Sequence, residues 1–129
     1  MYFTKAIQSG FKNVVNFSGR ASRSEYNYWL LFLLILQTSI IIIDPPNPND
    51  ISPSADNLLN SRLFSFIYFV FIIPSTSLVI RRFHDIGKSG WHVLLPFTII
   101  GIFPYYYWTC FVIGDKGENA YGPNPLNNN

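Results

Sequence analysis

Residues 81–91 read Arg81-Arg82-Phe83-His84-Asp85-Ile86-Gly87-Lys88-Ser89-Gly90-Trp91, the most charge-dense stretch in the second half of the chain. An apolar run, residues 63–80, precedes this stretch, and a mostly apolar run, residues 91–113, overlaps its last residue. A helix that crosses a bilayer needs about 20 mainly apolar residues. We therefore expect a membrane protein in which residues 81–90 form a short polar loop between two crossing segments.

The composition indicates that a bilayer surrounds much of the chain. Of the 129 residues, 49% are hydrophobic and only 12% are charged, whereas a soluble domain carries about 25% charged residues. The net charge of +2 comes from basic clusters beside the apolar runs, which suits a membrane surface and predicts no nucleic-acid partner. Cys110 is the only cysteine, so no disulfide can form within one copy of the chain.

The fold class predicted from these runs is an all-α membrane protein, a single domain over residues 1–129. Three transmembrane helices are expected at about 26–43, 63–80 and 91–113, as judged by length and apolar content. Four prolines in the first interhelical segment, 44–62, predict an external loop there.

The third apolar run contains helix breakers. Pro96, Gly101 and Pro104 interrupt it, and proline removes a backbone donor while glycine weakens a helix interior. A kinked third helix is the first prediction, and a re-entrant hairpin broken near residues 101–104 is the alternative.

The N-terminal segment, residues 1–25, is predicted to be cytoplasmic and to begin with a short amphipathic helix. Phe3, Ile7, Phe11 and Val14 recur at helical spacing, and the opposite face is polar. Such a helix either lies in the lipid headgroup layer or packs on the protein itself. Ser22 or Ser24 is a candidate N-cap for the first crossing helix.

The positions of the cations predict the orientation. Short loops rich in lysine and arginine stay cytoplasmic. Seven of the nine cations lie before the first predicted crossing or between the second and the third: Lys5, Lys12, Arg20, Arg23, Arg81, Arg82 and Lys88. The N-terminus and the 81–90 loop are therefore expected in the cytoplasm. Three crossings would put the polar tail, residues 114–129, outside, and a hairpin would return it to the cytoplasm.

Three motifs resemble the bacterial family known as domain of unknown function 805, the small YhaH-like inner-membrane proteins. The motifs are Phe17-Ser18-Gly19-Arg20-Ala21-Ser22-Arg23-Ser24-Glu25-Tyr26 with Trp29, the 81–91 stretch quoted above, and Gly117-Glu118-Asn119-Ala120-Tyr121-Gly122-Pro123-Asn124-Pro125. Phe83 stands where the family often has leucine, and Asn124 where aspartate is common. The resemblance implies a small helical inner-membrane protein and supplies no catalytic residues.

The charged residues of the first two motifs are expected to meet at one cytoplasmic membrane edge. The candidate cluster comprises Arg20, Arg23, Glu25, Arg81, Arg82, His84, Asp85 and Trp91. We expect Glu25 or Asp85 to pair with an arginine, because a charge in a partly dry region is costly without a partner. Binding of anionic lipid headgroups by the arginines and catalysis by His84 with Asp85 are the alternatives.

The C-terminal motif predicts a folded turn that packs against the helices or binds a partner, with candidate residues Asn119, Tyr121, Gly122 and Pro123. His84 and His92 are eight residues apart, and no further metal ligand accompanies them. We predict no metal site and no cofactor.

The predicted function is that of a non-enzymatic scaffold or adaptor in the bacterial inner membrane that supports envelope homeostasis. One alternative is a subunit of an oligomeric transporter or channel, with Gln37, Ser75, Thr76 and Ser77 turned inward. Another is a lipid-modifying enzyme at the cytoplasmic face. The expected partners are the bilayer with its anionic headgroups, and a second copy or another membrane protein.

Overall fold

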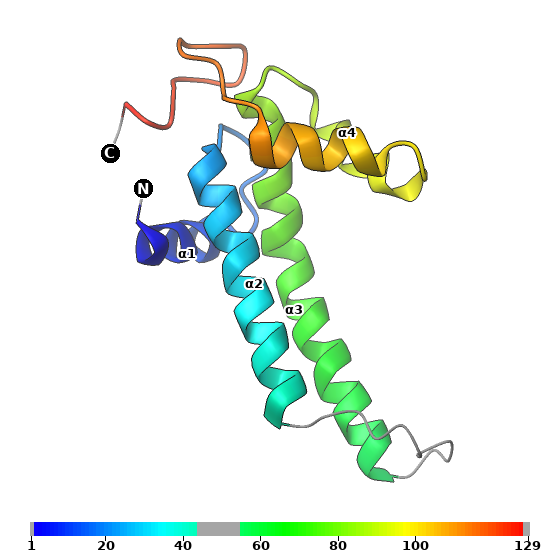
Figure 1. The fold of residues 1–129 in the computed structure, drawn as a ribbon. Helices are drawn as coiled ribbons and strands as arrows, with labels where there is room; N and C mark the ends of the chain where they lie inside the picture. Colours follow the sequence, from blue (N-terminus) through cyan, green and yellow to red (C-terminus); the bar gives the residue numbers. More distant parts are fainter. Residues whose placement is uncertain (1, 44–54, 128–129) are drawn as a thin grey trace.

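The computed structural model describes residues 2–43 and 55–127, and that part of the chain is all-α, as predicted (Figure 1). The elements in order are α1 (Phe3–Lys12), α2 (Arg23–Ile43), α3 (Ala55–Asp85), the 3₁₀ helix η1 (Gly90–Phe97), α4 (Ile102–Tyr106) and the π-helix η2 (Tyr107–Phe111). Helices α2 and α3 form a long antiparallel pair. Helix α1, the hairpin and the C-terminal segment all lie toward the same end of that pair (Figure 1).

Helix α2 begins three residues before the predicted start at Tyr26. Ser22 is its N-cap, because the Ser22 Oγ accepts a hydrogen bond from the backbone N–H of Glu25 at 3.2 Å. Of the two candidate caps, Ser22 therefore has the capping bond.

Helix α3 is longer at both ends than the predicted span 63–80. It begins at Ala55, so the loop predicted for 44–62 is wrong over residues 55–62. No proline follows Pro53 in this segment, so nothing there prevents helix formation. The remainder of the predicted loop, residues 44–54, lies outside the described residues.

At its other end, α3 continues through Asp85, so the prediction that residues 81–85 form a loop is wrong. The helix ends in a Schellman motif at Gly87, whose φ of 69° favours glycine. The N–H of Lys88 bonds to the carbonyl of Phe83 at 2.9 Å, and the N–H of Gly87 bonds to the carbonyl of His84 at 3.1 Å. Arg81, Arg82, His84 and Asp85 therefore occupy the last turns of a helix.

The continuous third helix predicted for residues 91–113 is wrong, and the structure has the hairpin. Helix η1 runs outward, the chain turns at residues 98–101, and α4 with η2 runs back (Figure 1). A Cβ at Gly101 would lie 2.2 Å from the carbonyl oxygen of Leu95, so the turn requires glycine. Eight 3₁₀ residues span about 16 Å, about half of the roughly 30 Å hydrocarbon layer.

Helix α1 packs on the protein, the second of the two placements considered for it. Ala6 and Gly10 are buried against α2, and a Cβ at Gly10 would lie 2.4 Å from the indole ring of Trp29. The ring of Phe11 meets Trp29 edge-on at 5.4 Å between centroids. The glycine that weakens the helix in isolation therefore allows its close approach to α2.

The buried core lies at the end of the α2–α3 pair that carries α1. It consists of Ala21, Tyr26, Trp29, Leu78, Val79 and Phe83. Toward the other end, large apolar side chains are exposed on both helices, among them Leu34 at 59%, Phe66 at 65% and Phe69 at 68%. Soluble monomers rarely expose contiguous apolar surface on this scale. Within the described residues, one helical segment is long and apolar enough to cross a membrane, Phe66–Asp85.

Candidate functional site

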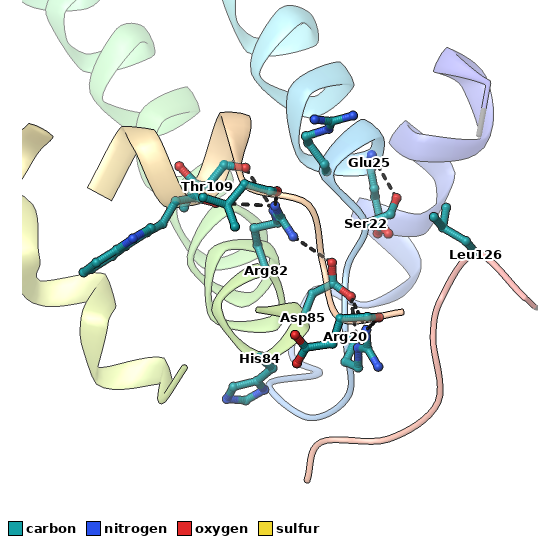
Figure 2. Close-up of polar contacts among 12 residues, drawn as sticks. Arg20, Ser22, Glu25, Arg82, His84, Asp85, Thr109 and Leu126 are labelled. Carbon is teal, nitrogen blue, oxygen red and sulfur yellow. Dashed lines mark hydrogen bonds and ion pairs between the residues drawn. The ribbon is translucent and has the colours of Figure 1, made fainter. Parts of the chain in front are cut away.

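The candidate site is centred on Asp85, in the last turn of α3, whose carboxylate lies between two arginines (Figure 2). Arg20 donates from Nε to Asp85 Oδ1 at 3.0 Å, and Arg82 donates from Nη1 to Asp85 Oδ2 at 2.7 Å. All three side chains are at most 4% exposed. A carboxylate this deeply buried needs such partners, since an unpaired charge there would be strongly destabilising.

Arg20 joins the segment before α2 to the C-terminal segment. Besides its pair with Asp85, its Nη1 donates to the carbonyl oxygens of Gly117 at 2.6 Å and Gly122 at 3.2 Å, and its Nη2 donates to that of Asp115. Nη2 also lies 2.9 Å from Asp85 Oδ1. These contacts engage all three nitrogen atoms of the guanidinium.

Arg82 binds the end of the returning limb of the hairpin. Its Nε donates to the carbonyl oxygen of Thr109 at 2.9 Å, and its Nη2 donates to those of Trp108 and Val112. These carbonyls lie at the end of η2, where helical C=O groups have no partner within the helix. The cation therefore both neutralises Asp85 and caps η2.

Glu25 and Arg81 form a second buried pair. Arg81 Nη1 lies 3.4 Å from Glu25 Oε1, and Ser9 of α1 donates its hydroxyl to the same oxygen at 2.7 Å. The remaining Arg81 donors, Nε and Nη2, are buried and have no hydrogen-bond partner among the described residues. Within the described part of the chain, two of the three guanidinium nitrogen atoms of Arg81 are thus buried without a hydrogen bond that would offset their desolvation.

His84 holds the C-terminal turn. Its Nδ1 lies 3.1 Å from the carbonyl oxygen of Gly19, and because a carbonyl only accepts, Nδ1 carries the proton. The imidazole stacks on the ring of Tyr121 at 3.9 Å between centroids. Asn119 donates from Nδ2 to the His84 carbonyl at 3.0 Å.

Gly114 allows the tail to pass beside the ion pairs. A Cβ at this position would lie 1.9 Å from Asp85 Oδ2. The next residue, Asp115, donates its backbone N–H to the Asp85 carbonyl at 2.8 Å. The tail is therefore joined to the end of α3 by its backbone as well as through Arg20.

Most of the predicted candidates meet at this site. The structure brings together Arg20, Glu25, Arg81, Arg82, His84 and Asp85, with Asn119, Tyr121 and Gly122 of the C-terminal turn. We call this set, with the segments it joins, the polar cap. Arg23 is exposed and donates to the Phe111 carbonyl at 3.1 Å. Trp91 is 79% exposed, and Pro123 is exposed on the turn.

Several contacts of the polar cap were not predicted from the sequence. The Ser77 hydroxyl bonds to the carbonyl oxygens of Asn13 and Asn16 at 2.7 and 2.6 Å, so it faces the N-terminal segment and not a channel. Thr109 and Val112 accept hydrogen bonds from Arg82 through their backbone carbonyls, and because every residue has a carbonyl, the sequence does not single these two out. Gly114 could have been noticed as a glycine directly after an apolar run.

Within residues 2–43 and 55–127, no three histidine, cysteine, aspartate or glutamate side chains are grouped so as to hold a metal ion. The arrangement instead joins five parts of the chain through buried charge: the 13–22 segment, the start of α2, the end of α3, the end of η2 and the tail.

Comparisons with known proteins agree with the motifs. The profile of a family described as "Protein of unknown function (DUF805)" matches residues 14–123. The inner membrane protein YhaI of Escherichia coli K12 is 33% identical over 122 residues, which cover 91% of this chain and 92% of that protein. YhaH, another inner membrane protein of the same strain, is 29% identical over 120 residues, covering 88% and 90% of the two chains. No solved structure matches. Since the match includes every segment of the polar cap, the chain belongs to the DUF805 family of proteins of unknown function.

Proposed function

We propose that this protein is a multi-pass protein of the bacterial inner membrane in which α2 and α3 cross the bilayer and the 91–113 hairpin re-enters it. The exposed apolar side chains of α2, α3 and the hairpin support this placement, as does the apolar segment Phe66–Asp85. The relatives YhaI and YhaH carry the name inner membrane protein.

In this arrangement both termini lie in the cytoplasm. The hairpin returns the tail to the polar cap, so Lys116 joins the cations at that end, and Arg62 near the start of α3 is the one cation toward the other end. Such an imbalance favours a cytoplasmic polar cap. A green fluorescent protein fused after Asn129 should fluoresce, and alkaline phosphatase fused there should be inactive. The reverse result would exclude this topology.

The role that best suits the polar cap is that of a non-enzymatic scaffold or adaptor. This proposal rests on one observation: the side chains of Arg20, Arg82 and Asp85 form ion pairs with one another, and the two arginines donate their remaining hydrogen bonds to backbone carbonyls. A buried network that is satisfied in this way rigidifies a structure. The cap therefore presents a fixed surface at the membrane, against which another envelope component can dock.

Site-specific photo-crosslinking in cells tests this role. A photoreactive residue at Glu118, exposed on the cap, should give discrete protein adducts, whereas one at Leu34, exposed on α2, should give lipid adducts. The Arg20→Gln variant should give fewer Glu118 adducts, because the tail loses its three carbonyl contacts with Arg20. Absence of protein adducts at Glu118 and also at exposed Lys12 and Lys116 would contradict the adaptor proposal.

Binding of an anionic lipid headgroup at the polar cap is a second candidate, favoured by the exposed side chain of Arg23. Among the described residues this guanidinium donates to the Phe111 carbonyl from Nη1, and arginine donors suit phosphate oxygens. Mass spectrometry of lipids that co-purify in mild detergent should find phosphatidylglycerol enriched with the wild type and depleted with Arg23→Gln. Equal lipid content in the two preparations would remove this candidate.

A further inference from the structure

Gln37 is a primary amide in the apolar part of α2. It lies 14 residues after Arg23, the first residue of the helix, which corresponds to about 21 Å along the axis. Its side chain is exposed. If α2 crosses the bilayer, as proposed above and as this inference requires, Gln37 lies within the hydrocarbon layer.

The polar neighbours of Gln37 form hydrogen bonds with backbone carbonyls of their own helix. Thr38 donates its hydroxyl to the Leu34 carbonyl at 2.7 Å, and Ser39 donates to the Ile35 carbonyl at 2.8 Å. The Gln37 amide has two donors and an acceptor, and none of them bonds to any residue in the described part of the chain. Hydrocarbon offers no hydrogen bonds, so an exposed amide there calls for a partner from another molecule.

Gln37 also lines a groove with a volume of about 330 Å³ between α2 and α3, to which Val93 of η1 and Tyr105 of α4 also contribute. On the α2 side the lining residues are Leu33, Leu36, Gln37 and Ile40, which follow the i, i+3, i+4, i+7 spacing of one helical face. Across from them, α3 contributes mainly apolar side chains, among them Phe71. An apolar helical stripe with one polar residue is the pattern that specifies association between helices.

We infer that the occupant of this groove is a second copy of the chain, with the Gln37 amides of the two copies bonded to each other. A primary amide is self-complementary, because its N–H₂ donates and its oxygen accepts. Two identical amides related by a two-fold axis therefore satisfy each other, as an isologous interface requires. A lipid acyl chain can fill the groove but can bond to neither end of the amide.

Cysteine crosslinking in native membranes tests the pairing directly. In a Cys110→Ala background, Gln37→Cys should form a disulfide-linked dimer upon mild oxidation. Ile35→Cys is the matched control, since Ile35 is 52% exposed on the same helix but two residues away, and hence on a different face. Absence of a dimer at position 37, or equal dimer formation at both positions, would overturn the inference.

A second measurement examines the amide itself. Energy transfer between labelled full-length chains in phosphatidylethanolamine–phosphatidylglycerol vesicles should report association that Gln37→Leu weakens about tenfold. Thr38→Val should leave association unchanged, because Thr38 is satisfied within α2, and Gln37→Asn should retain more association than Gln37→Leu. Undiminished association of Gln37→Leu would rule out the amide pair.

Extraction of the membranes with alkaline carbonate distinguishes failure of the self-association proposal from failure of the proposed membrane placement. A chain that stays in the membrane but transfers no energy between copies overturns self-association and leaves the membrane placement intact. A chain that is released by carbonate overturns the placement itself, and with it the reason for pairing at Gln37.

Discussion

Asp85 is the residue on which most of the polar cap depends. Its two carboxylate oxygens bind different arginines, one from the segment before α2 and one from its own helix. Removing one member of a buried ion pair is far more damaging than its net contribution suggests, because the partners keep their charges without compensation. Here two guanidinium groups would be left facing each other.

We therefore expect Asp85→Asn to lower the free energy of unfolding by about 3 to 5 kcal/mol. Thermal unfolding in mild detergent, followed by circular dichroism, would measure the loss. Glu118→Gln is the control, since this carboxylate is exposed on the tail and its removal should have little effect. Equal unfolding temperatures for Asp85→Asn and wild type would show that the ion pairs do not support the fold.

Two glycines of the tail provide a matched comparison. At Gly114 a Cβ would overlap Asp85, whereas at Gly117 nothing lies within 4 Å of the added atom. Gly114→Ala should destabilise the cap by about 1 to 3 kcal/mol, the usual effect of overpacking, and should make the tail sensitive to protease. Gly117→Ala should behave as wild type, and cleavage of both variants at the same rate would contradict the close approach at Gly114.

The sequence predicts the charged side chains of the polar cap better than their partners. Arg20, Glu25, Arg81, Arg82, His84 and Asp85 stand out because charges are scarce in this chain and these flank apolar runs. Their acceptors include the carbonyls of Thr109, Val112 and Gly117, which no side-chain pattern can indicate. The pairing of Arg20 with Asp85 rather than Glu25 depends on the helical placement of Asp85, and the sequence suggested a loop there.

At the scale of elements, the helix breakers of the third apolar run decide the topology. Hydropathy and length alone predict a crossing at residues 91–113. Pro96, Gly101 and Pro104 divide it into limbs that are each too short to cross, and the turn at Gly101 has no room for a side chain. The ends of α3 differ from the prediction for a related reason. The sequence shows where the apolar run ends, but a helix can continue beyond that point when its backbone groups are hydrogen-bonded and its charged side chains are paired.

The packing of helix α1 on α2 can be tested by cysteine labelling. Its contact with α2 depends on Gly10, because the indole of Trp29 occupies the space of a Cβ. Ala6 is 0% exposed on the same face, so a cysteine at position 6 in a Cys110→Ala background should react slowly with a water-soluble maleimide. Adding Gly10→Ala should accelerate this reaction, whereas Lys5→Cys, on the exposed side, should react rapidly in either background. Rapid labelling at position 6 without Gly10→Ala would contradict the packing of α1 on α2.

At the scale of the whole molecule, the distribution of polar and apolar side chains is the reverse of that in a soluble protein. Charges of the polar cap are buried at one end, and large apolar side chains are exposed along the helices and on the hairpin. This arrangement suits a molecule whose solvent is lipid along most of its length and water at its ends. It also means that the ion pairs that join the segments are shielded from the aqueous phase.

Stability in detergent should accordingly respond little to salt. Raising sodium chloride from about 0.1 M to about 1 M shortens the Debye length from about 10 Å to about 3 Å, which weakens exposed ion pairs but hardly affects buried ones. We expect the unfolding temperature of the wild type to change by no more than about 2 °C, which for a domain of this size is well under 1 kcal/mol. A fall of many degrees would indicate that the cap pairs are open to water.

The long sequence separation of the Arg20 contacts has a consequence for biosynthesis. The carbonyl partners of this arginine lie 95, 97 and 102 residues later in the chain, so they are translated well after it. When residues 20–85 have been synthesised, the Arg20 guanidinium can pair with Asp85 but still lacks these three carbonyls. The polar cap can therefore close only after residues 115–122 have been synthesised, and a chain that stopped before them would leave the Arg20 guanidinium short of hydrogen-bond partners.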